Sequence, residues 1–279
     1  KPVDGSPRWS GNLKKLKIEL NNGNFIFTDA NNNEAIADDG RIEGSALTFW
    51  TDGTQLLGLG ADGRTTTLGG AGQKLPGYLS GNPGTTNGSG VTSATGPRKL
   101  FYDRATPVQL GALNATSTSV QSALRTDLGV ATNAAASQLL HYARGYEVGT
   151  TAAPAASYTA AARSWWHGAV LHSRPIAINY GARSGYSSSN PDIRIVYGSA
   201  DGYLRMLTNT ETSGAESGRE SWAFMPRSVM NQQKVLMDED NGGAFPYGVD
   251  GPVVAYVQDF GSSGGVADNV INSGNPDDA

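Results

Sequence analysis

Short runs of alternating apolar and polar residues dominate the second half of the chain. Positions 193, 195 and 197 form one apolar face of a segment with the period of two residues that is typical of a pleated strand. The Asp201-Gly202 pair favours a tight turn, after which the apolar run 203–207 returns. An aromatic strand at 222–224 follows, and the rings of Trp222 and Phe224, two residues apart, are expected to be buried on the same side against an adjacent sheet. Such a unit cannot bury both of its faces alone, so the pattern predicts neighbouring blades of a β-propeller.

The first part of the chain also predicts strands. Apolar residues alternate with polar ones on both sides of the Asn22-Gly23 pair, which favours a hairpin turn. Two further strands are expected at 46–50 and 99–102. Between them, the glycine- and threonine-rich segment 69–98 predicts a long mobile surface loop.

The period changes to that of helices near residue 116. Val120, Ala123 and Leu124 fall on one helical face after a Thr/Ser start that can cap a helix. A second helix is expected from about Asn133, with Gly145 as its end. These helices predict an insertion between strands. We therefore interpret 1–279 as part of a single β-propeller domain, divided into a first blade region at 1–115, a two-helix insertion at 116–148, a linker at 149–162 and further blades at 163–279.

Composition supports strands joined by turns. The 279 residues include 37 glycines and 13 prolines, and only 16% are charged, which argues against a helical bundle or a disordered chain. A formal net charge of -4 gives no electrostatic case for nucleic acid, and no apolar run is long enough to span a membrane. The absence of cysteine excludes disulfides, thiol nucleophiles and zinc–thiolate sites. A start without Met and an end in a polar loop predict an excised piece of a longer polypeptide.

One acidic segment is a candidate calcium site. Asp29, Asn31, Asn33 and Asp38 place oxygen side chains at relative positions 1, 3, 5 and 10 of a turn-rich stretch. Hard oxygen ligands at such spacings suit Ca²⁺, which makes calcium the candidate cofactor. The glycine that is usual at position 6 is absent, and Asp and Asn are also favoured in ordinary turns, so a purely structural turn is the alternative.

Other motifs have ordinary structural explanations. The segment 58–63 fits G-x-G-x-x-G, but the sequence after it is a poor helix, so we interpret it as a turn. His141 is expected to be a partly exposed polar residue of the inserted helix. His167 and His172 lie five residues apart on either side of an apolar strand, on opposite faces, where they cannot share a metal. No catalytic residue is predicted.

Several longer stretches resemble the PilY family of type IV pilus tip adhesins and biogenesis factors. They span nearly the whole chain: Arg8-Trp-Ser-Gly-Asn-Leu-Lys-Lys15, Ser164-Trp-Trp-His-Gly-Ala-Val-Leu-His-Ser-Arg-Pro175, Ile195-Val-Tyr-Gly-Ser-Ala-Asp-Gly-Tyr-Leu-Arg205, Glu220-Ser-Trp-Ala-Phe-Met-Pro226 and Pro246-Tyr-Gly-Val-Asp-Gly-Pro-Val-Val-Ala255. The resemblance implies an all-β fold, a partial and modified quinoprotein-like β-propeller with the two-helix insertion. The resemblance also implies a calcium loop of the pattern Asp-x-Asp-x-Asn-x-Asp-x-x-Asp. Against this pattern, Asn31 of the segment 29–38 replaces an acid and Ala35 removes one side-chain ligand.

The resemblance implies a non-enzymatic protein associated with the tip of a type IV pilus, which acts in surface adhesion, pilus biogenesis and twitching motility. It would be exported to the pilus tip, the bacterial cell surface or the outer membrane. Its partners would be minor pilins, an unidentified host or abiotic surface, and the remaining blades of the parent chain. A quinoprotein dehydrogenase that uses pyrroloquinoline quinone is an alternative, because the blade pattern is shared. A periplasmic propeller scaffold is another.

Overall fold

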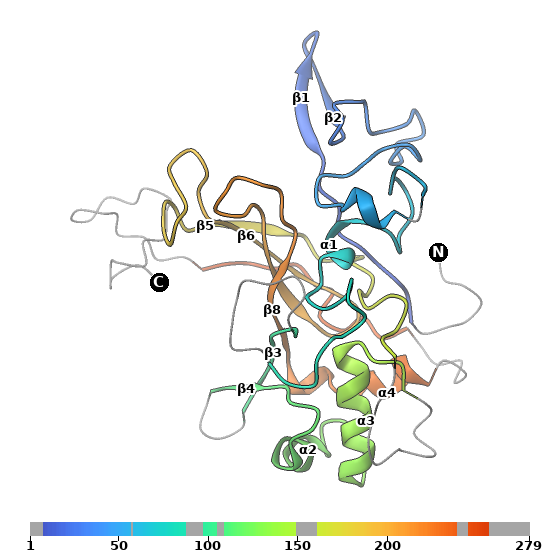
Figure 1. Ribbon diagram of the computed structural model, residues 1–279. Coiled ribbons are helices and arrows are strands. Elements are labelled where there is room, and N and C mark those ends of the chain that lie inside the picture. Colours follow the sequence, from blue (N-terminus) through green and yellow to red (C-terminus); the bar gives the residue numbers. More distant parts are fainter. Residues whose placement is uncertain are drawn as a thin grey trace, which may run out of the picture.

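The computed structural model contains two β-sheets and several short helices. It describes residues 8–56, 58–87, 97–104, 109–148, 161–238 and 245–256. Within these residues, one sheet has two strands and the other has six. Figure 1 shows the small sheet projecting at one end and helices α2, α3 and α4 grouped at the opposite end, with the large sheet between them.

The six-stranded sheet has the order β4-β3-β8-β7-β6-β5. Strands β5 to β8 form an antiparallel meander in chain order, whereas β3 pairs with β8 in parallel and carries β4 at the edge. The strands span Leu100–Asp103 (β3), Leu110–Ala112 (β4), Ile176–Asn179 (β5), Ile193–Gly198 (β6), Leu204–Thr208 (β7) and Glu220–Met225 (β8). The strands expected at 193–197, 203–207, 222–224 and 99–102 are therefore confirmed.

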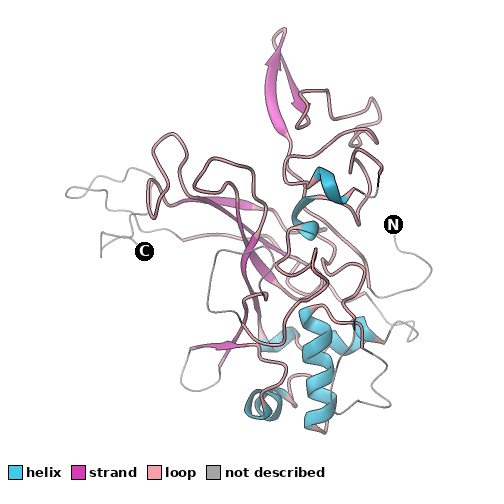
Figure 2. Cartoon of the chain, viewed as in Figure 1, coloured by secondary structure: helices cyan, strands magenta, loops and turns pink. Residues whose placement is uncertain are grey.

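The helices begin and end where the sequence supplies caps. The Ser117 hydroxyl accepts a hydrogen bond from the Val120 amide at the start of α2, and Thr132 does the same for Ala135 in α3. Gly145 ends α3 at a φ of 121°, a conformation that only glycine adopts readily. Both expected helices are confirmed. The helices span Gly70–Gln73 (α1), Thr118–Leu124 (α2), Asn133–Arg144 (α3) and Gln232–Met237 (α4), with 3₁₀ turns at Gly53–Gln55 and Arg227–Val229 (Figure 2).

Strands β1 (Lys17–Asn21) and β2 (Asn24–Thr28) form the second sheet. Asn22 and Gly23 both have positive φ, at 49° and 82°, as a two-residue hairpin turn requires. The expected Asn-Gly hairpin is therefore confirmed. We call residues 17–28 the hairpin arm.

One face of the large sheet is buried, and two apolar clusters lie beneath it. The larger cluster joins Leu100, Tyr203 and Met225 of the sheet side to Leu139 of α3 and Leu236 of α4. The smaller one joins Tyr197 and Leu207 to Trp50 and Ala71. Helices and the N-terminal segment therefore supply the apolar surface that this face of the sheet needs.

The expectation of an all-β, partial quinoprotein-like propeller is wrong. The described chain has mixed helical and strand content, and its two sheets do not close into a barrel or a propeller. The strand–turn–strand pattern correctly indicated a local meander, but meanders also occur in open sheets. Here the buried face packs on α3 and α4 rather than on a neighbouring blade, and β3 extends the sheet in parallel beyond β8.

Three local expectations also differ from the structure. Residues 46–50 form a loop that ends in a turn rather than a strand. Their backbone makes no strand ladder, and the Phe49 amide instead donates a hydrogen bond to the Lys15 carbonyl. The segment expected as a mobile loop contains the buried helix α1, while residues 88–96 lie outside the described part. Trp222 and Phe224 are only half-buried, because β8 turns Ala223 and Met225 toward the core instead.

No described helix is both long and apolar enough to cross a lipid bilayer. This agrees with the absence of a predicted membrane span.

The two faces of β7 allow a matched test of the fold. Leu207 is fully buried in the smaller cluster, whereas its neighbour Met206 is half-buried on the other face. We expect Leu207→Ala to lower the free energy of unfolding by about 2–5 kcal/mol and Met206→Ala by clearly less. Urea denaturation of both variants measures the difference, and equal losses would contradict the assignment of the buried face.

Candidate functional site

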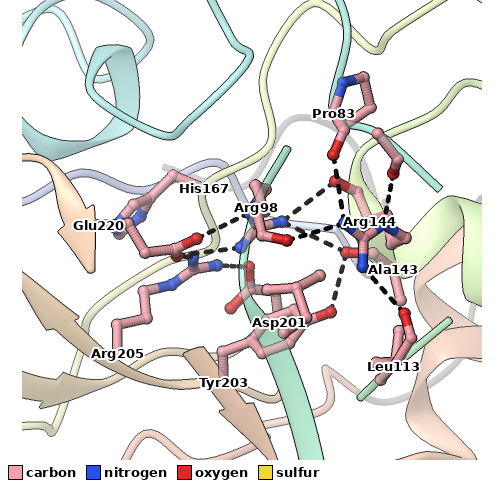
Figure 3. A network of polar contacts seen from close by, with 12 residues as sticks. Pro83, Arg98, Leu113, Ala143, Arg144, His167, Asp201, Tyr203, Arg205 and Glu220 are labelled. Carbon is pink, nitrogen blue, oxygen red and sulfur yellow. Dashed lines mark hydrogen bonds and ion pairs between the residues drawn. The ribbon is translucent and has the colours of Figure 1, made fainter. Parts of the chain in front are cut away.

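Four charged residues form a buried chain across the inner face of the large sheet (Figure 3). Glu220 of β8 accepts two hydrogen bonds from Arg98, at 2.8 Å from Nε and 3.0 Å from Nη2. Arg205 of β7 donates to the same carboxylate and also to Asp201. The side chains of Arg98, Arg205 and Glu220 are fully buried, and that of Asp201 is 18% exposed.

This network fixes the charge of its acids. Although burial acts to raise it, the pKa of Glu220 lies below its ordinary value because Arg98 and Arg205 face it. The pKa of Asp201 is lowered in the same way against its burial, mainly by Arg205. Both carboxylates are therefore ionised at neutral pH, and each has its counter-charge in place. Such a saturated network holds strands together and leaves no acid free to transfer protons.

Arg144 lies at the last turn of α3 and binds backbone carbonyls. It donates to Leu113 at 2.9 Å, to Arg98 at 2.8 Å and to Thr86 at 3.0 Å, and also to Gly84. Burial and the nearby charge of Arg98 lower its pKa to about 10, so the guanidinium stays charged at neutral pH. One side chain thus joins α3 to three loops, as Figure 3 shows for Leu113 and Arg98.

His167 is buried and neutral. Its Nδ1 lies 2.8 Å from the Gly168 carbonyl and its Nε2 lies 2.6 Å from the Tyr197 hydroxyl. Burial, followed by the charge of Arg205, lowers the pKa of His167 to about 4. In the neutral ring Nδ1 donates to the carbonyl and Nε2 accepts from Tyr197, so both nitrogens are engaged.

A small cavity lies next to this network, between α3, α4 and the chain around residue 165. Its volume is about 30 Å³, enough for one or two water-sized groups. Arg163, His167, Asp201 and Tyr142 line it, together with an aromatic rim that includes Trp9 and Phe245. The two rim rings lie 4.2 Å apart between centroids. This cavity combines charged and aromatic groups in the manner of a ligand site.

A larger recess of about 440 Å³ is lined by Tyr78, Gln73 and Trp165, among others. Its polar groups are already engaged: the Tyr78 hydroxyl donates to the Ser164 carbonyl at 2.7 Å, and the Gln73 side chain accepts from the Asp52 amide at 2.8 Å. The recess is of ligand size but has few free polar groups to select a ligand.

The hairpin arm exposes one apolar face. Ile18 pairs with Phe27 and Leu20 with Phe25, which places these four side chains on the same side. Their exposed fractions are 60%, 44%, 67% and 78%, respectively. Together they present on the order of 500 Å² of apolar surface, which is comparable with the largest patch on a typical monomer. Neither strand pairs with the large sheet, so the arm offers an interaction surface.

The predicted calcium ligands fall into two separate turns. Asp29 closes the first turn: its carboxylate accepts from the amides of Asn31 and Asn33, each at 2.9 Å, and from Leu47 at 3.0 Å. Although burial acts to raise it, these backbone hydrogen bonds hold the pKa of Asp29 below its ordinary value. Asp38 is exposed in the next turn, which the Ile36–Ile42 bridge closes.

Asn31 and Asn33 are therefore beside Asp29, but the structure places Asp38 in a different turn. Across the described ranges, no group of three or more histidine and acidic side chains is arranged to hold a metal ion. The Asp29 carboxylate stabilises its turn through backbone hydrogen bonds, which explains an acidic residue at this position without a bound cation. Calcium binding stays a prediction.

His141 and His172 also make structural contacts. His141 is buried at 3% exposure rather than partly exposed, with its Nδ1 2.7 Å from the Ser137 carbonyl. The side chain of His172 is 62% exposed, 3.3 Å from Asp250. The Asp250 carboxylate also accepts backbone hydrogen bonds from Leu171, His172 and Ser173, so it organises that loop.

The buried arginines and Glu220 were missed from the sequence. Arg205 interrupts the apolar run 203–207, and alternation assigns its position to the face of Tyr203 and Leu207. A charge on the apolar face of a strand was the available signal for a buried ion pair. Arg98 binds the same carboxylate, Glu220, as Arg205 does. Nothing in the local sequence indicates this, because Arg98 lies far from both residues along the chain.

Comparisons with known proteins do not identify the chain: no protein family, curated protein or solved structure matches it.

Removal of the central carboxylate tests the network. We expect Glu220→Gln to lower the free energy of unfolding by about 3–5 kcal/mol, because two buried guanidinium groups lose their counter-charge. Glu216→Gln is the control: Glu216 pairs with Lys15 at the surface, at 2.7 Å with a side chain 33% exposed. Its loss should cost less than about 1 kcal/mol. Denaturant melts of both variants decide, and similar losses would contradict a structural role for Glu220.

The lowered pKa of His167 predicts an acid-sensitive fold. The unfolded chain binds a proton near pH 6.5 and the folded chain only near pH 4, so stability is full above 6.5 and falls as the pH drops toward 4. The loss from His167 is about 3 kcal/mol. Unfolding free energies at pH 7, 5.5 and 4.5 should decline in the wild type and decline less in His167→Gln. His141, whose pKa burial also lowers, adds to the same window, so His141→Gln serves as a second reference.

Proposed function

We propose that this chain is a non-enzymatic protein of the type IV pilus tip, which acts in surface adhesion and pilus biogenesis. The observation that carries the proposal is the hairpin arm. Its face of Ile18, Leu20, Phe25 and Phe27 is exposed to a degree that isolated two-stranded hairpins do not sustain without a partner. An apolar surface of this kind binds protein, since burial of its area in an interface is favourable.

The partner that we propose is a minor pilin at the pilus tip. The sequence resemblance to tip adhesins supports this choice, and so does the edge of β1, which pairs only with β2 and can accept a strand from another protein. The arm would supply both the main-chain hydrogen bonds and the apolar contacts. The chain would be exported and reach the bacterial surface with the pilus.

The buried charges suit a scaffold for this arm. Glu220 and Asp201 are held by arginines, and both nitrogens of His167 are engaged, so these groups stabilise the body that carries the arm. The dehydrogenase alternative depended on a propeller axis to hold its quinone. The open sheet supplies no support for it.

The arm can be tested in a piliated bacterium that encodes this chain. We expect the double variant Leu20→Ser with Phe25→Ser to reduce, at least tenfold, the amount of this protein that co-purifies with sheared pili, and to reduce surface attachment and twitching. The loss of two anchors of an apolar interface has this size. Thermal unfolding of the variant should match the wild type, because both side chains are exposed.

Leu110→Ser is the matched control, since Leu110 is 64% exposed on β4, outside the arm. It should leave co-purification unchanged. Wild-type levels of the double variant on pili would overturn the role of the arm. An absorbance change on incubation with pyrroloquinoline quinone and calcium would instead favour the dehydrogenase.

A further inference from the structure

Arg163 is a cation that the fold leaves incompletely paired. Its backbone is used, since its amide donates to Gly145 at 2.9 Å and its carbonyl accepts from Trp166 Nε1 at 2.7 Å. Its side-chain Nε, in contrast, is buried without any hydrogen-bond partner. Arg98, Arg144 and Arg205 each donate several hydrogen bonds from their guanidinium groups. Arg163 is partly buried as a residue, and its buried Nε distinguishes it from the fully buried Arg98, Arg144 and Arg205.

Tyr142 holds the guanidinium in place. The centre of the Arg163 guanidinium lies 3.9 Å from the centroid of the Tyr142 ring, which is the geometry of a cation–π contact. Stacking fixes the guanidinium but uses only its face. The N–H groups point outward from its edges, where they can bind an acceptor. The guanidinium group of Arg163 is therefore held in a fixed place while its Nε atom lacks a hydrogen-bond partner.

The surrounding charges do not neutralise Arg163. Asp201 and Glu147 attract it, but neither forms an ion pair with it in the described part of the chain, and Asp201 already binds Arg205 and Ser199. Burial lowers the pKa of Arg163, the direction expected for a charge without a close counter-ion. An anion bound beside Arg163 would supply the close counter-charge that this side chain lacks in the described part of the chain.

We propose that the cavity beside Arg163 binds the carboxylate of a small acid with an apolar or aromatic body. The planar fork of a guanidinium matches the two oxygens of a carboxylate. The cavity volume of about 30 Å³ admits such a group and little more. The remainder of the ligand would lie against the rim of Trp9 and Phe245, whose rings are 4.2 Å apart, with the half-exposed Tyr247 next to Phe245 at 5.1 Å.

Two sources can supply this chemistry: a free acid, or the terminal carboxylate of a peptide. Benzoate represents the first and N-acetylphenylalanine the second, while benzamide is the neutral control of the same shape. We expect both acids to raise the melting temperature of the full chain with increasing concentration, and benzamide not to do so. Stronger binding of N-acetylphenylalanine than of benzoate, measured by calorimetry, would assign the site to a peptide terminus, and the reverse to a free acid.

Arg163→Met is the decisive variant. It removes the charge but keeps an unbranched side chain over Tyr142. Because the charge that it removes is unpaired in the absence of ligand, we expect a melting temperature equal to or above that of the wild type. The affinity for the acids should fall at least tenfold, the size expected for losing a hydrogen bond to a charged group. Arg125→Met is the control, since Arg125 is partly exposed and donates to the Ala131 carbonyl at 3.2 Å; it should leave binding unchanged.

An ordered water in the cavity is the competing explanation. It predicts no difference between benzoate and benzamide, and it predicts that Arg163→Met is destabilising because a water-mediated contact is lost. Either result would overturn the proposal, as would full retention of acid binding in Arg163→Met. If that variant does not fold, Arg163→Lys keeps the charge without the fork and should weaken acid binding at least tenfold. The site is separate from the hairpin arm, so its failure would leave the proposed function standing.

Discussion

The interaction on which this fold depends is the pairing of Glu220 with two arginines from different segments. Arg205 lies on the adjacent strand β7, and Arg98 comes just before β3. A fully buried carboxylate is costly unless it is paired and hydrogen-bonded, so each arginine is required to be in place when the sheet closes. The pairing explains why β3 aligns beside β8 in parallel, although more than a hundred residues separate them. It also places charge between the two apolar clusters beneath the sheet.

The helical segment is attached to the sheet by the same polar layer. The hydroxyl of Tyr203 donates to the Ala143 carbonyl at 3.0 Å, and Arg98 donates to the Arg144 carbonyl at 3.2 Å. Arg144 in turn binds the Arg98 carbonyl. These bonds satisfy the last carbonyls of α3, which have no partner within the helix. Helix α3 therefore contributes to the core of the domain.

The sequence predicted the local elements because their signals are local. The Asn22-Gly23 pair specifies its hairpin, alternation specifies β6 and β7, and Thr132 with Gly145 delimits α3. The arrangement of these elements depends on contacts between residues that are distant along the chain. The position of Arg205 on the apolar face of β7 indicates a buried ion pair, but only the fold shows that Glu220 is its partner. The propeller prediction was wrong because it rested on local strand patterns, whereas the arrangement of the sheet depends on contacts between distant segments such as β3 and β8.

In the candidate site, too, local turns could be predicted from the sequence, whereas contacts between distant residues could not. Oxygen side chains recur at Asp29, Asn31 and Asn33, and this spacing predicts calcium ligands, whereas the structure uses the Asp29 carboxylate to hold the turn. Arg163 carried no signal at all, because an unpaired guanidinium differs from a paired one only in what surrounds it. In contrast, the apolar face of the hairpin arm can be derived from the sequence once the turn is known, since a two-residue loop fixes which side chains share a face.

The hairpin arm and the Arg163 cavity differ from the buried polar network in one physical respect. The buried carboxylates of Glu220 and Asp201 and the neutral ring of His167 have their partners within the chain, so these interactions contribute to the free energy of folding. The apolar face of the arm and the Nε atom of Arg163 lack such partners in the described structure. Groups of this kind lower the stability of the isolated chain, and a bound partner recovers that loss as binding free energy. Binding at these two places is therefore expected to add to the stability of the folded chain.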